Sequence, residues 1–81
     1  MVYKNKDYDK MAEIDNRLKF CQQIAELRRS AGLSQAALGE KAGIKQQNIN
    51  NLENGKHSTG IDVLMRIASV LDCEICMIKN H

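Results

Sequence analysis

Glycines divide the 81-residue chain into short segments, and this division limits the folds that it can adopt. Gly32, Gly43 and Gly55 each follow a stretch in which apolar residues recur at the spacing of an α-helix. Glycine takes left-handed backbone conformations without steric cost, so it commonly ends helices. Helices are therefore predicted over residues 12–31, 35–42, 46–54 and 61–71.

The two ends of the chain lack this helical pattern. Residues 1–11 are polar, and we expect a flexible arm there. Residues 73–79 are rich in cysteine and β-branched side chains, which favours a short strand. We therefore expect an all-α fold, with an arm at 1–11, one domain at 12–72 and a C-terminal strand or tail at 73–81.

Composition excludes several classes of protein. No apolar run approaches the ~18 residues that a membrane-spanning helix needs. The N-terminus lacks the apolar region of a signal peptide, and an odd number of cysteines, three, indicates free thiols. We therefore expect a cytoplasmic protein, because thiols stay reduced in that compartment. The net charge is only +2, so a surface for nucleic acid has to be formed locally.

Neither catalysis nor metal binding is indicated by the spacing of reactive side chains. His57 and His81 do not lie at a catalytic spacing from a nucleophile, and no glycine-rich phosphate loop is present. Cys73 and Cys76 have the spacing of a metal or redox pair, but on a strand their thiols would point to opposite faces. A zinc site also needs four ligands. We therefore expect no enzyme activity, no metal and no cofactor.

Residues 46–54 have an unusual composition for a surface helix, because six of the nine are Gln or Asn. Each Asn weakens a helix by roughly 0.6 kcal/mol relative to Ala, so the four Asn cost about 2 kcal/mol. Amide side chains pair with the edge of adenine in the major groove of DNA. This favours a surface for DNA recognition, and the alternative is a neutral helix that only faces water.

The segment at 35–54 also has the pattern of a helix-turn-helix motif. Gly43 lies where the chain must reverse, and the small Gly39 lies where the two helices approach closely. The apolar positions that hold the two helices together are Leu38, Ala42, Ile44, Ile49 and Leu52.

The run ELRRSAGLSQAALGEKAGIKQQNINNLENGK, followed by IDVLMRIASVL, resembles the phage-repressor/Cro-like (lambda repressor-like, xenobiotic-response-element type) helix-turn-helix family. The resemblance covers about residues 20–72, and the stretch QQNINNLENGK is especially similar to the recognition helix of lambdoid phage repressors. It implies a compact domain of four to five helices that binds double-stranded DNA and regulates transcription, as a repressor. The helix at 46–54 would lie in the major groove.

The resemblance also implies roles for individual residues. Arg28 and Glu53 would form a buried structural ion pair, and Lys45 replaces the Ser or Thr that usually caps the third helix. Base contacts are implied for Gln35, Gln46, Gln47 and Asn51, and we add Asn50 from the same amide-rich helix. Phosphate contacts are implied for Ser34, Lys45, Asn54, Lys56 and His57.

One such domain contacts only a few base pairs, so we expect a homodimer on a pseudo-palindromic operator. The unpaired edge of the terminal strand Glu74–Lys79 is the favoured interface, and the exposed side of the fourth helix with the loop before it is the other candidate. On that strand Ile75 and Met77 share one face, and Cys76 and Ile78 share the other.

A second hypothesis concerns a protein partner. Small proteins of this family also resemble the antitoxins of toxin–antitoxin pairs, which repress their own operon. The arm at 1–13 or the C-terminus would then bind a toxin protein. A third hypothesis is a helical adaptor that has lost DNA binding, which predicts no salt-sensitive affinity for DNA.

Overall fold

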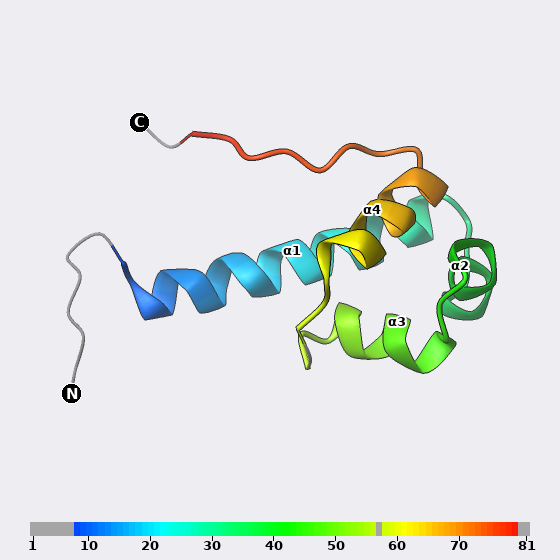
Figure 1. Ribbon diagram of the computed structural model, residues 1–81, viewed down its shortest axis with the longest axis horizontal. Coiled ribbons are helices and arrows are strands. Elements are labelled where there is room, and N and C mark those ends of the chain that lie inside the picture. The colour runs from blue at the N-terminus through cyan, green and yellow to red at the C-terminus, as the bar shows by residue number, and fades with distance from the viewer. Residues whose placement is uncertain (1–7, 57, 80–81) are drawn as a thin grey trace.

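The computed structural model describes residues 8–56 and 58–79, and this part of the chain is all-α (Figure 1). The expected fold class is therefore confirmed. The helices are α1 (Lys10–Ser30), α2 (Gln35–Ala42), α3 (Gln46–Glu53) and α4 (Ile61–Val70). None of the helices in the described ranges is long and apolar enough to cross a membrane.

Helix α1 begins at Lys10, two residues before the predicted start at residue 12. The Asp9 carboxylate caps it by accepting hydrogen bonds from the backbone N–H groups of Met11 (2.9 Å) and Ala12 (3.3 Å). A capping Asp satisfies N–H groups that have no partner within the helix, so it stabilises the first turn. The predicted arm at 1–11 therefore includes two residues that are helical. Residues 1–7 lie outside the described part.

The other helix ends follow the local sequence. The Ser34 hydroxyl caps α2 by accepting from the N–H of Ala37 at 3.0 Å. Gly43 ends α2 with φ +71°, in the left-handed region predicted for it. Helix α3 ends one residue earlier than predicted, because Asn54 is its C-cap. Lys45, the N-cap of α3, makes no capping side-chain bond.

The core lies where α2, α3 and α4 meet the C-terminal half of α1. Leu38, Ile49 and Ile67 are its most completely buried side chains, one each from α2, α3 and α4. Gly39 allows α2 and α3 to approach: the N–H of Ile44 donates to its carbonyl at 2.8 Å, and a side chain at this position would collide with the carbonyl oxygen of Ile44. The N-terminal half of α1 extends beyond this core (Figure 1).

The predicted C-terminal strand is absent from the described residues. Residues 73–79 are extended but join no sheet (Figure 1). The physical reason is that a strand exists only when its N–H and C=O groups bond to a second strand, and no other described segment of this chain is one. The segment starts at a defined turn, where Asp72 has φ +55° and the N–H of Cys73 donates to the carbonyl of Ala68 at 2.8 Å. Residues 80–81 lie outside the described part.

Candidate nucleic-acid interface

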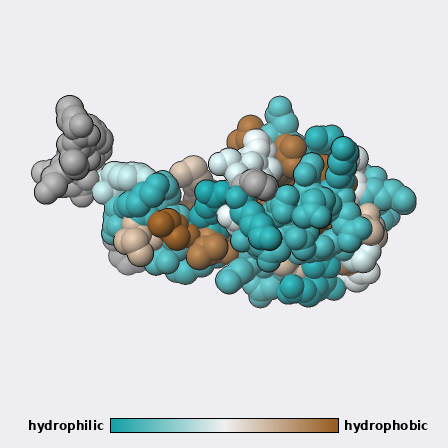
Figure 2. All heavy atoms as spheres, turned by 90° about the horizontal axis from the view of Figure 1, so that it is seen from below, coloured by the Kyte–Doolittle hydropathy of each residue, from teal (hydrophilic) through white to brown (hydrophobic). Residues whose placement is uncertain are grey.

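Helix α3 buries its apolar side and exposes its amide side. Ile49 is 0% exposed and Leu52 is 5% exposed, so these two side chains hold the helix against the core. Gln46, Gln47 and Asn48 are exposed at the N-terminal end of the helix. The face of the molecule that carries α3 is largely hydrophilic (Figure 2). The amide-bearing side chains at the start of α3 are thus free to meet a ligand.

Hydrogen bonds fix several of these amides in place. Gln47 Nε2 donates to Asn51 Oδ1 at 3.1 Å, one turn further along α3. Asn50 is held more completely: its Nδ2 donates to Gln35 Oε1 at 3.3 Å, and its Oδ1 accepts from Asn54 Nδ2 at 3.3 Å. Asn50 therefore differs from Gln46, Gln47 and Asn51, because both ends of its amide bond to neighbouring side chains.

Gln35 connects this amide network to a buried ion pair. Its Nε2 donates to Glu53 Oε1 at 3.0 Å while its Oε1 accepts from Asn50, so both ends of the amide are oriented from α3. Gln35 is half-buried at the first position of α2. The side chain that α2 contributes to the candidate surface is thus positioned by α3.

Arg28 and Glu53 join α1 to α3 by a bidentate ion pair. Arg28 Nε donates to Glu53 Oε2 at 2.6 Å, and Nη2 donates to Oε1 at 3.0 Å. Arg28 Nη1 also donates to the carbonyl of Leu33 at 2.8 Å, which fixes the connection before α2. The two side chains are 10% and 5% exposed. The pair therefore fixes the relative positions of α1, α2 and α3.

The environment of the ion pair shifts both pKa values. Burial by itself raises the pKa of the Glu53 carboxyl, but hydrogen bonds from Arg28 and Gln35 and the charge of Arg28 lower it more, so the net pKa is below its ordinary value. The hydrogen bond to Glu53 raises the pKa of Arg28, against the opposing effect of burial. Both groups are therefore charged at neutral pH.

The residues assigned to phosphate contacts lie at the edges of α2 and α3. Ser34, Lys45, Asn54 and Lys56 are all exposed. Ser34 and Lys45 precede the two helices, whereas Asn54 and Lys56 follow α3. His57 lies outside the described residues. Such positions border the exposed side of α3, where the backbone of a bound duplex would run.

A groove of about 630 Å³ lies between α3 and α4, and it contains a basic residue that the sequence analysis missed. Lys45 lines the groove from the start of α3, and Arg66 lines it from α4. The available signal was that Arg66 is the single basic residue in the mainly apolar stretch 61–71. Its position beside the turn at Gly43 depends on how α4 packs against α2 and could not be predicted.

The fold and the exposed α3 define a helix-turn-helix domain. The helix-turn-helix family HTH_3 matches residues 24–78, and the chain belongs to this family. The resemblance to phage-repressor/Cro-like proteins is thereby confirmed at the level of the family. No curated protein matches the chain.

Several solved structures are similar to this one, among them a controller protein and a transcriptional regulator. The restriction-modification controller protein C.AhdI from Aeromonas hydrophila is 30% identical, with a TM-score of 0.71 over 74% of this chain and 91% of that chain. An HTH_3 family transcriptional regulator from Vibrio cholerae is 31% identical, with a TM-score of 0.67 over 72% of this chain. The match spans only 33% of that longer regulator.

Proposed function

We propose that the protein is a sequence-specific, double-stranded DNA-binding regulator of transcription that acts as a repressor in the cytoplasm. The observation that carries the proposal is the orientation of α3, whose apolar residues are buried while Gln46 and Gln47 are exposed. Two structurally similar proteins, a controller protein and a transcriptional regulator, support the same class of function.

In this proposal the base edges are contacted by amides from α2 and α3. Gln46 and Gln47 are exposed in the first turn of α3, the part of a recognition helix that enters the major groove first. The bond from Gln47 to Asn51 leaves Gln47 Oε1 and the Asn51 amide nitrogen available, so together they offer an acceptor and a donor to adenine. Gln35 contributes from α2, and Asn50 acts mainly by holding Gln35.

Phosphate contacts by Ser34, Lys45, Asn54, Lys56 and His57 would fix the position of the domain on the duplex. The N-terminus of α2 supports this role, because its first-turn N–H groups and helix dipole favour a phosphate. These contacts carry no sequence information, whereas the amide contacts do.

The active form in this proposal is a homodimer formed through residues 75–78. Met77 is 99% exposed and Ile78 is 83% exposed, although both are large and apolar. The extended backbone at 73–79 joins no sheet within the described chain, so a second copy could supply the missing strand. Ile75 and Cys76 complete the pairing segment. Replacement of Met77 and Ile78 by Lys should yield monomers in sedimentation velocity, while Lys79→Gln should leave the dimer intact.

An antitoxin role is the second candidate, and one observation favours a protein partner. Met11, Ile14 and Leu18 are exposed at helical spacing on the part of α1 that extends beyond the core, and they are 65%, 39% and 43% exposed. An apolar stripe of this kind is common where proteins interact. Co-purification of a neighbouring gene's product with the wild type, but not with Ile14→Asp, would support this role.

The main experiment is selection of bound duplexes from a random pool, followed by affinity measurements on the selected site. Gln46→Ala and Gln47→Ala should each cost roughly 1–3 kcal/mol on that site and little on random DNA. Lys56→Ala should weaken binding to both equally. Gln23→Ala, an exposed amide on α1, is the matched control. Equal losses for Gln46→Ala on selected and random DNA would contradict base recognition by α3.

A further inference from the structure

The groove between α3 and α4 brings two cationic side chains to one surface. Lys45 is exposed at the N-cap of α3, and Arg66 is exposed on α4. Arg66 Nη1 lies 3.6 Å from the position that a Cβ on Gly43 would occupy, so the guanidinium lies beside the turn of the helix-turn-helix motif. Two residues that lie far apart in the sequence therefore form one positive site.

Arg66 has no anionic partner in the part of the chain that the structure describes. Asp62, one turn earlier on α4, does not approach it within the distance of an ion pair, and within residues 8–56 and 58–79 no hydrogen bond involves its guanidinium. None of the residues that line the groove is acidic. Arg28, by contrast, has its charge matched by Glu53. The charge of Arg66 is thus available to an external anion.

The groove also opens onto the amide surface of α3. Asn48 and Asn51 line it together with Lys45 and Arg66. Helices α3 and α4 both begin beside it, and neither N-cap provides a side-chain bond to the free N–H groups of the first turn. The partial positive charge of these two helix ends adds to that of the side chains. An anion bound here would therefore lie directly beside whatever α3 contacts.

We propose that Arg66 binds a backbone phosphate of the DNA, with Lys45 lining the same groove, so that the DNA interface extends from α2 and α3 onto α4. This inference rests on the proposed function, because the phosphate belongs to the duplex that α3 recognises. DNA is favoured over a free anion because the site is continuous with the amide surface. A phosphate contact adds affinity without adding sequence preference.

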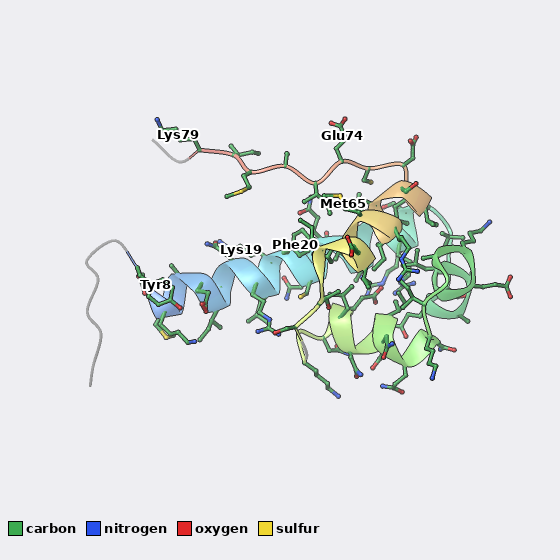
Figure 3. The ribbon with its side chains drawn as sticks, viewed as in Figure 1. Tyr8, Lys19, Phe20, Met65, Glu74 and Lys79 are labelled. Atoms are coloured by element: carbon green, nitrogen blue, oxygen red, sulfur yellow. The ribbon has the colours of Figure 1, made fainter. Side chains whose placement is uncertain are left out.

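The test measures the salt dependence of DNA affinity for the wild type, Arg66→Gln and Lys19→Gln. Lys19 is exposed on α1, outside the groove, so its replacement removes the same charge elsewhere (Figure 3). Loss of one phosphate contact should reduce the slope of log affinity against log salt by about 0.9. Between 50 and 200 mM salt, wild-type affinity should therefore fall about 3.5-fold more than that of Arg66→Gln. Lys19→Gln should keep the wild-type slope.

Duplexes with single neutral methylphosphonates provide a second measurement that does not depend on a variant folding. One such replacement should weaken the wild type and have no further effect on Arg66→Gln. Wild-type salt dependence in Arg66→Gln would overturn the inference and leave the proposed function intact. The same conclusion would follow if Arg66 bound inorganic phosphate but made no contact with DNA. Absence of any salt-sensitive DNA affinity in the wild type would instead refute the proposed function.

Discussion

Removal of one partner from the Arg28–Glu53 pair tests the most consequential contact in the fold. In Arg28→Met the Glu53 carboxylate, whose side chain is 5% exposed, keeps only the hydrogen bond from Gln35. The carbonyl of Leu33 also loses its side-chain donor. An uncompensated buried charge costs roughly 3–5 kcal/mol. A chain of this length is stable by about 4–12 kcal/mol, so the variant should lose a large share of its stability.

Urea denaturation followed by circular dichroism measures this loss, at one fixed protomer concentration because association would add stability. The melting temperature should fall by about 12–40 °C, since 1 kcal/mol corresponds to about 4–8 °C in a domain of this size. Glu53→Gln should cost a similar amount, because it leaves Arg28, whose side chain is 10% exposed, without its counter-ion.

The double variant Arg28→Met, Glu53→Leu distinguishes two causes of the lost stability: the missing attraction between the two side chains and the unpaired charge that a single variant leaves buried. It should be more stable than either single variant, because two apolar side chains replace two buried charges. Recovery should be incomplete, since the Gln35 amide and the Leu33 carbonyl each lose a partner, at a cost of about 1–3 kcal/mol per group. The reasoning fails if Arg28→Met costs less than about 1 kcal/mol, or if the double variant is no more stable than either single variant.

Three further predictions concern pH and the caps. Because the pKa of Glu53 is lower in the folded than in the unfolded chain, its stabilising effect should be full above about pH 5 and be lost as pH falls through the lowered pKa. The urea midpoint of Glu53→Gln should therefore depend less on pH in this range than that of the wild type. An equal pH dependence of the two midpoints would contradict the prediction. Ser34→Ala should reduce the free energy of unfolding by about 1 kcal/mol, because the N–H of Ala37 loses its acceptor; an unchanged urea midpoint would mean that water replaces the cap. Lys45→Ser should stabilise the protein by roughly 1 kcal/mol by supplying the cap that α3 lacks, while its DNA affinity should become less sensitive to salt; lower stability would show that the lysine is needed in the fold.

Local sequence determined the helices of this protein and the side that each one buries. Apolar spacing places Ile49 and Leu52 inward and leaves Gln46 and Gln47 outward, and residues near in sequence are enough to establish this pattern. Ser34 and Gly43 set the limits of α2 for the same reason. The cap at Asp9 was also present in the sequence, but polar residues around it led to the prediction of an arm.

Tertiary structure alone decided which distant side chains share one site. Gln35 is held between Glu53 and Asn50, and Arg66 lies beside Gly43, because packed helices bring together residues whose spacing in the sequence has no period. The segment at 73–79 shows that local sequence can also predict an element that the tertiary structure does not form. Its composition favours a strand, but strand formation requires hydrogen bonds to a partner, and composition cannot supply that partner.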